Sequence, residues 1–115
     1  MKHPFLLGAL GYPLLEICAR GRTHWSMALA GGASCAAIRR IGQSGMNPLG
    51  KALAGGLAIT GIEALCGCLW NRRHQVWDYR RQPLNWRGQV CLRYSALWCL
   101  MAAGILYIDN LARRA

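Results

Sequence analysis

Glu63 is a carboxylic acid within an otherwise small and apolar stretch, residues 52–70, of a chain that has four acidic residues against 14 lysines and arginines. An ionised carboxylate is costly to bury in apolar surroundings, so it must face protein partners or water. Such a group can bind a cation or exchange a proton along a solute pathway. It can also hold two helices together as a neutral hydrogen-bonding group. The residues alone leave both roles open.

Other polar and small side chains recur at helical spacing, both around this acid and in two further apolar blocks of the chain. Small residues on such a stripe let another helix approach closely, and polar residues offer hydrogen bonds to it. We therefore expect the stripes to converge on the interior of a helical bundle. The candidate residues of a substrate or ion pathway are Glu16, Thr60, Glu63, Asn71 and Ser95.

A second group of candidates lies in the polar segments between the apolar blocks. Asp78 lies among arginines, so we expect it to be ionised and paired, and the rings of Trp77 and Tyr79 are suited to the level of lipid headgroups. Basic residues beside helix ends are suited to an anionic headgroup or substrate. A structured cap between the third and fourth helices is favoured over catalysis. The candidates for a loop clamp or anion site are Arg22, His24, Trp77, Asp78, Tyr79 and Asn85.

Four apolar blocks must position these side chains. The chain is 54% hydrophobic and 16% charged, whereas a soluble domain carries about 25% charged residues. A membrane-spanning helix needs about 20 apolar residues, with a lower limit of about 17, so the last two blocks qualify and the first two are marginal. We predict an all-α integral membrane bundle: a single domain, residues 1–115, of four transmembrane helices with short loops, at about 5–19, 25–41, 52–70 and 90–108.

Several function classes are disfavoured. The net charge of +10 could suggest nucleic-acid binding, but the arginines alternate with tryptophan and tyrosine as in a membrane interface, and no independently folded platform is evident. Residues 45–51, GMNPLGK, match most of a phosphate loop, yet Ala52 replaces its final serine or threonine. On a helix, Cys66 and Cys68 point in directions about 200° apart and cannot chelate one metal. We expect no metal, no cofactor and no nucleic acid.

The basic residues do not decide the membrane orientation, because they are nearly equally divided between the two sides of a four-span topology. Two interpretations stay open: a weak preference for both termini outside, or insertion in both directions as an antiparallel homodimer. The expected partners are the lipid bilayer, further copies of the chain as a homo-oligomer such as a dimer, and a small solute or ion. The expected location is the cell inner (cytoplasmic) membrane, as a multi-pass protein.

Three stretches of the chain resemble a known family. They are YPLLEICARGRTHWSMALAGG at 12–32, the pattern of Ile62, Glu63, Gly67 and Asn71, and VWDYRRQPLNWRGQVCLRYSALW at 76–98. They resemble the ABC-transporter type IV, or CmpB-like, family of small bacterial membrane proteins. The resemblance runs from about residue 11 to residue 98 and implies a multi-helix integral membrane protein. Similar proteins usually have serine after Trp-Asp-Tyr, where this chain has Arg80.

These observations support three functions. The first is a small transporter- or channel-like permease component with Glu16 and Glu63 in its polar interior. The second is a non-catalytic membrane subunit or lipid-interacting structural protein, in which the polar stripes serve packing. An intramembrane enzyme using Glu63, His24 and Asp78 ranks last, because no nucleophile and base occur at a recognisable spacing. A water-sized cavity between the first, third and fourth helices would favour transport, and a dry packed centre would favour the subunit.

Overall fold

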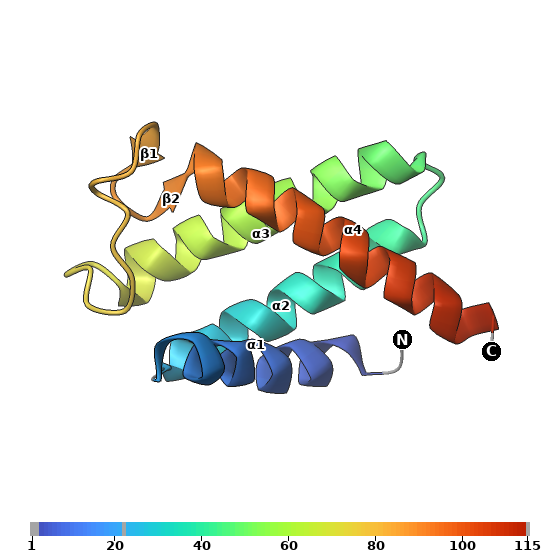
Figure 1. The fold of residues 1–115 in the computed structure, drawn as a ribbon, viewed down its shortest axis with the longest axis horizontal. Helices are drawn as coiled ribbons and strands as arrows, with labels where there is room; N and C mark the ends of the chain where they lie inside the picture. Colours follow the sequence, from blue (N-terminus) through green and yellow to red (C-terminus); the bar gives the residue numbers. More distant parts are fainter. Residues whose placement is uncertain (1–2, 22, 115) are drawn as a thin grey trace.

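A computed structural model describes residues 3–21 and 23–114. Within them the chain forms four helices and one short hairpin in the connection between the last two helices (Figure 1). The all-α prediction is confirmed, and each predicted helix overlaps an observed one. The elements are α1 (Pro4–Arg20), α2 (Trp25–Gly42), α3 (Pro48–Trp70), the antiparallel strands β1 (Asn85–Trp86) and β2 (Val90–Cys91), and α4 (Leu92–Arg114).

The predicted boundaries of α3 and α4 need correction. Helix α3 begins at Pro48 rather than at residue 52, because the Asn47 side chain accepts a hydrogen bond from the backbone N–H of Gly50 at 2.7 Å and caps the helix. A proline in the first turn costs the helix no hydrogen bond. Helix α4 begins at Leu92 rather than at residue 90, since Val90 and its neighbour pair with β1. It also runs on to Arg114, beyond residue 108.

The helices form two pairs that meet through their inner members. Helix α1 packs on α2, α3 packs on α4, and α2 joins α3, whereas α1 and α4 make little direct contact within the described residues. Both termini and the α2–α3 turn lie at one end of the molecule, and the α1–α2 turn and the α3–α4 connection (residues 71–91) lie at the other (Figure 1). This up-and-down order of the helices is the one expected of a four-span chain.

Glycines set the closest helix contacts. A Cβ atom added to Gly56 of α3 would lie 2.8 Å from the Cα atom of Cys99 on α4, and one added to Gly8 of α1 would overlap the carbonyl of Gly31 on α2. Contacts this close are possible only where a side chain is absent. The predicted role of the small residues as close-approach sites is therefore confirmed for these two pairs of helices.

The outer surface is strongly apolar. Large aliphatic side chains along α1, α3 and α4 are exposed, with Leu100 at 72%, a distribution that lipid tolerates and water does not. Helices α3 and α4 are the two in the described part of the chain that are long and apolar enough to cross a membrane, and α1 is a shorter apolar helix. These features indicate a membrane protein. That α1 and α2 also span the bilayer stays a prediction.

Candidate functional site

Asn71 organises the polar end of the bundle. It follows the last residue of α3 and is 1% exposed. Its Nδ2 donates to the carbonyl oxygen of Trp77 at 2.7 Å and to Oε1 of Gln89 at 2.8 Å, and its Oδ1 accepts from the backbone N–H groups of Val76 and Trp77 at 2.8 and 3.3 Å. Protein groups therefore use both ends of the amide. In this arrangement Asn71, predicted as a pathway residue, holds the α3–α4 connection in place.

Trp77 and Gln89 complete this network. The Trp77 indole donates from Nε1 to the carbonyl oxygen of Gln89 at 2.8 Å, and the Gln89 side chain donates from Nε2 to the carbonyl oxygen of Asn71 at 2.9 Å. Trp77 is 7% exposed and packs in a cluster with Met27 and Cys66. The prediction that its ring lies among lipid headgroups is wrong, because the ring faces the protein interior. Gln89 was not among the predicted residues.

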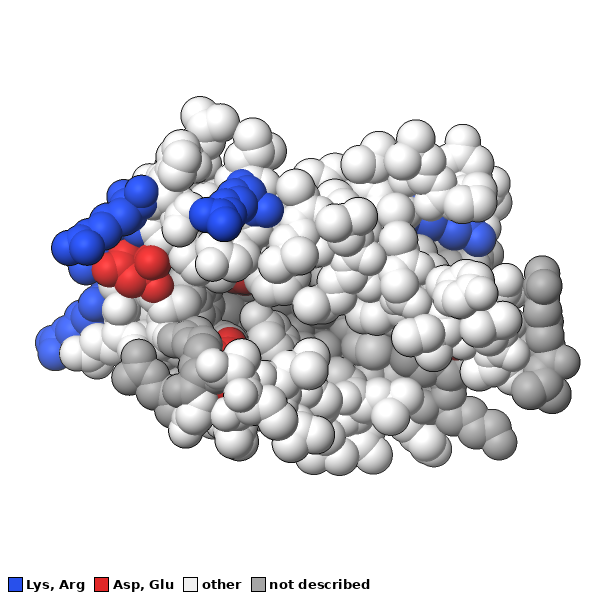
Figure 2. All heavy atoms as spheres, in the orientation of Figure 1, with Lys and Arg blue, Asp and Glu red and all other residues white. Residues whose placement is uncertain are grey.

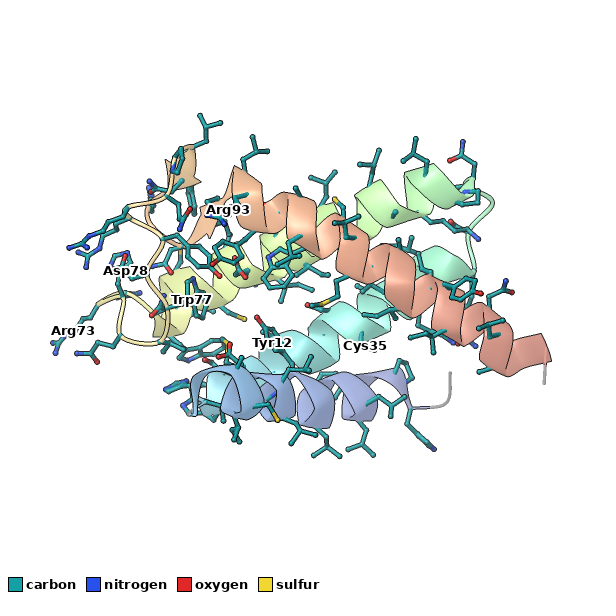
Figure 3. The ribbon with its side chains drawn as sticks, viewed as in Figure 1. Tyr12, Cys35, Arg73, Trp77, Asp78 and Arg93 are labelled. Atoms are coloured by element: carbon teal, nitrogen blue, oxygen red, sulfur yellow. The ribbon has the colours of Figure 1, made fainter. Side chains whose placement is uncertain are left out.

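Asp78 lies on the exposed side of the connection, at the polar end of the molecule (Figure 3). It binds Arg80 through two oxygens, with Nη2–Oδ2 at 2.7 Å and Nε–Oδ1 at 2.9 Å. The hydrogen bonds from Arg80 hold the pKa of Asp78 well below its ordinary value. The predicted pairing with an arginine is confirmed. The partners are two residues apart, so the pair fixes a local turn and does not join two helices.

Asn85 and Tyr79 also have local roles within the connection. Asn85 donates from Nδ2 to the carbonyl oxygen of Gln82 at 2.9 Å, and its Oδ1 accepts from the backbone N–H of Gly88 at 2.9 Å, so it closes the hairpin turn. The Tyr79 ring stacks on Tyr94 of α4, with ring centroids 4.6 Å apart. This stacking attaches the connection to α4, as the predicted cap requires.

Glu16 and Glu63 are brought together from α1 and α3. Each is 8% exposed, and they line one small cavity of about 20 Å³ (the inner cavity) together with the hydroxyl-bearing residues Tyr12, Ser34 and Tyr79. A space of this size can hold about one water molecule. Oε1 of Glu63 is buried and makes no hydrogen bond with any described residue.

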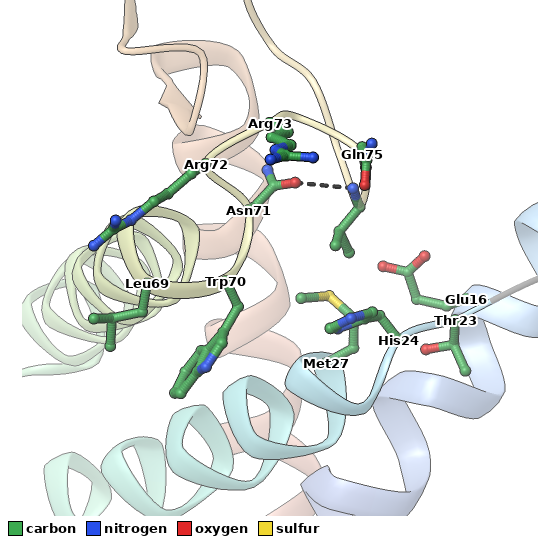
Figure 4. Close-up of a pocket in the computed structure, with 11 residues that line it drawn as sticks. Glu16, Thr23, His24, Met27, Leu69, Trp70, Asn71, Arg72, Arg73 and Gln75 are labelled. Carbon is green, nitrogen blue, oxygen red and sulfur yellow. Dashed lines mark hydrogen bonds between the residues drawn. The ribbon is translucent and has the colours of Figure 1, made fainter.

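A larger pocket lies outside this cavity, at the polar end (the outer pocket). It has a volume of about 560 Å³, and its lining includes Glu16, His24, Asn71, Arg72 and Arg73. Figure 4 shows Glu16 and His24 on one side of the pocket and Asn71 and Arg73 on the other. Glu16 lines both the outer pocket and the inner cavity. It therefore lies where a polar solute entering from this end would first meet a buried acid.

His24 caps the first turn of α2. Its Nδ1 accepts from the backbone N–H of Ser26 at 3.2 Å and lies 2.7 Å from the Ser26 hydroxyl oxygen. His24 also lines the outer pocket. Arg22, its predicted partner in an anion site, lies outside the described residues.

Thr60 and Ser95 join α3 to α4. Their hydroxyl oxygens lie 2.8 Å apart, and the Thr60 hydroxyl also donates to the carbonyl oxygen of Gly56 at 2.9 Å. Neither residue is among the described lining of the inner cavity. The five predicted pathway residues thus fall into three places: the two acids at the inner cavity, a hydroxyl pair between α3 and α4, and Asn71 in the connection. The described residues contain no group of three or more histidine, cysteine or acidic side chains that could hold a metal.

A family model described as Putative ABC-transporter type IV matches residues 17–113. The chain belongs to this family. The resemblance found in the sequence is thereby confirmed, and the match covers α2, α3, α4 and the α3–α4 connection. The ABC-transporter type IV model reaches Glu63 but begins just after Glu16. No curated protein and no solved structure gave a match. The family name together with the two apolar helices indicates a membrane protein related to transporters.

Proposed function

We propose that the chain is a small transporter- or channel-like permease component, multi-pass in the cell inner membrane, with Glu16 and Glu63 in its polar interior. One observation carries the proposal: Glu16 lines the outer pocket, the inner cavity and a third cleft between α1 and α4. An acid shared by adjoining spaces is suited to pass a cation or proton between them. Acidic residues in membrane helices characteristically mark such pathways.

The path from the outer pocket through the inner cavity does not continue along the centre of the described bundle. A solute that enters the outer pocket meets Glu16 and then Glu63, but Ile38 and Ala102, both fully buried, lie further along the bundle. Passage to the other side would require the α1–α2 pair to move relative to the α3–α4 pair. The sparse contact between α1 and α4 is compatible with such a motion.

We also propose that the chain acts as a homo-oligomer, such as a dimer. The inner cavity of about 20 Å³ is too small for more than about one water molecule. A wider path would need walls supplied by a second copy of the chain. Chemical crosslinking in native membranes tests this proposal, and a chain that stays monomeric at all crosslinker concentrations would contradict it.

Flux through liposomes that contain the purified chain tests the proposed function. A pH-sensitive dye trapped inside the liposomes reports proton entry under an imposed membrane potential. We expect wild-type flux above that of protein-free liposomes, and a loss of flux in Glu16→Gln, which removes the charge and keeps the shape. Tyr107→Leu is the control, because Tyr107 is exposed on α4 and lines none of the described cavities. Equal flux in wild-type, Glu16→Gln and protein-free liposomes would contradict the proposal.

The alternative is a non-catalytic membrane subunit or lipid-interacting structural protein. It is favoured by the way protein groups use the polar atoms of Asn71, Thr60 and Ser95. In that case the interior acids would serve as hydrogen-bonding contacts between helices. The flux assay distinguishes the two functions. A structural subunit would show no flux of any tested ion, and substitutions of its carboxyl groups would change its stability only.

A further inference from the structure

The third cleft mentioned above lies between α1, the α3–α4 connection and α4, and we name it the aromatic cleft. Its volume is about 430 Å³, which falls within the range of about 300–1,000 Å³ found for small-molecule sites. The space is left open because α1 packs on α2 and α4 packs on α3. Figure 2 shows a hollow in this face of the molecule, with acidic side-chain atoms inside it.

Aromatic rings form most of one wall of the aromatic cleft. The Tyr79 and Tyr94 rings are stacked at 4.6 Å, Tyr94 lies 6.2 Å from Trp98, and Trp98 meets Tyr12 edge-on at 6.3 Å. These four rings make a continuous surface from the connection, over α4, to α1, and Trp77 also lines the cleft. The faces of such rings attract cations, and an aromatic wall is how proteins recognise organic cations such as quaternary ammonium groups.

The charged residues around the cleft also favour a cation, as the aromatic rings do. Two of the four acids of the chain, Glu16 and Asp78, line the cleft, and no lysine, arginine or histidine is among its described lining residues. Glu16 lies on the buried wall of the cleft, and Asp78 lies on its exposed side, where it binds Arg80. The chain as a whole is basic, with a net charge of +10, whereas the charged residues in the described lining of this cleft are acidic. It favours a cation over an anion of equal size.

An apolar extension continues from the aromatic cleft along α1 and α4. It has a volume of about 400 Å³ and shares Tyr12, Leu15, Trp98 and Met101 with the cleft. Its remaining described lining is mainly aliphatic residues and glycine, includes Ile105 and Ile108, and has one acid, Asp109. A ligand with its charge at the rings could place apolar groups in this extension. Because the outer faces of α1 and α4 are apolar, such a ligand could also enter sideways from the bilayer.

We infer that the aromatic cleft binds a lipophilic organic cation, with the charged centre against the four rings and Glu16 and the apolar groups in the extension. A calcium ion is not the expected ligand, because it needs six to eight oxygen ligands, whereas the cleft offers two carboxyl groups and one of them binds Arg80. The inference rests on the proposed function, since it names the ligand class of the transport site. Its test uses equilibrium binding without flux, so the two can fail separately.

Tetraphenylphosphonium and tetraphenylborate are the probes, because they have the same shape and opposite charge. Each is measured by equilibrium dialysis against the full chain in lipid nanodiscs, with protein-free nanodiscs as background. We expect saturable binding of tetraphenylphosphonium and no binding of tetraphenylborate above background. Equal binding of both ions, or no saturable binding of the cation, would overturn the inference. This comparison needs no variant, so it does not depend on how any substitution folds.

Variants of Tyr94 locate the site. Tyr94→Leu removes one ring of the wall and should weaken tetraphenylphosphonium binding about 30-fold, the loss expected for one desolvated cation–π contact. Tyr94→Phe keeps the ring and should bind like wild type. Tyr107→Leu, on the exposed face of the same helix, is the matched control and should also bind like wild type. Equal affinity in the Tyr94→Leu and Tyr107→Leu variants would refute this location. Saturable binding without flux of any tested ion through the liposomes, tetraphenylphosphonium included, would leave the site standing and contradict the transport proposal, whereas flux without binding would do the reverse.

Discussion

Replacing Asn71 with alanine should destabilise the protein more than any other single polar change in the α3–α4 connection. The substitution removes four hydrogen bonds made by a side chain that is 1% exposed. The carbonyl oxygen of Trp77 and Oε1 of Gln89 would stay buried without their donor, and the buried backbone N–H of Trp77 would lose its acceptor. Each buried group left without a partner costs about 1–3 kcal/mol, so three of them cost about 3–9 kcal/mol of unfolding free energy.

Asn85→Ala is the matched control for this prediction. Asn85 makes three similar hydrogen bonds in the same connection, but it is exposed, so water can replace the lost partners. We expect a loss of about 1 kcal/mol or less for this variant. Asn71→Asp is a useful second variant, because it keeps the shape but replaces the amide donor with an oxygen that faces two acceptors. It should therefore be nearly as damaging as alanine.

Thermal unfolding of the purified variants in detergent, followed by tryptophan fluorescence, measures these differences. Trp77 is one of the five tryptophans that contribute to this signal, and its Nε1 donates to Gln89 within the network. The signal should change at a clearly lower temperature in Asn71→Ala than in Asn85→Ala. Equal midpoints for the two variants would refute the reasoning that burial makes the Asn71 amide decisive.

Three further predictions concern packing, charge and the membrane. Gly56→Ala should lower the free energy of unfolding by about 1–3 kcal/mol, because the added methyl group overpacks against Cys99. Gly61→Ala is the control: nothing lies within 4 Å of the added Cβ, so thermal stability should stay equal or rise. A larger loss of stability in Gly61→Ala than in Gly56→Ala would contradict the α3–α4 contact. Arg80 lowers the pKa of Asp78 below its ordinary value of 3.8. The ion pair therefore stabilises the connection above pH 3.8, and this stabilisation is lost as the pH falls below 3.8. Asp78→Asn should for this reason make the stability of the protein depend less on pH in the acid range. An unchanged pH dependence would argue against the clamp. The chain should remain with membranes through high-salt and carbonate washes and dissolve only in detergent, and release by salt alone would contradict a membrane protein.

Local sequence patterns were sufficient to predict the helices, because each apolar block is long and is bounded by polar residues. They misplaced the start of α3, since Asn47 and Pro48 form a turn in many proteins but here serve as the cap and first residue of the helix. The short hairpin was missed because each strand has only two residues. Its pairing depends on Asn85 and on a left-handed backbone at Gly88, features that are common in loops of every kind.

The candidate site was predictable where helical spacing decides it and unpredictable where distant segments meet. The stripes on α1 and α3 predict a shared polar interior for Glu16 and Glu63, and both residues line the inner cavity. Trp77 was assigned to the interface because tryptophan beside arginine is typical of membrane belts. Its true partner, the carbonyl of Gln89, lies 12 residues further along the chain, beyond any helical spacing. The aromatic wall was missed for the same reason, because its rings come from α1, the connection and α4.

The measurement that tests the central claim most directly is flux through Glu63→Gln liposomes, prepared with the same amount of folded protein as the wild type. Glutamine keeps the volume and hydrogen-bonding capacity of Glu63 and removes its titratable group. If the acid serves a pathway, this variant should fold and assemble normally yet lose ion- or proton-coupled flux. If the acid only joins helices, glutamine should substitute well, and Glu63→Leu should instead lower stability by about 0.6–2 kcal/mol. Loss of flux at normal stability is the predicted result, and wild-type flux in Glu63→Gln, or no flux of any tested ion in the wild type, would contradict the transport account.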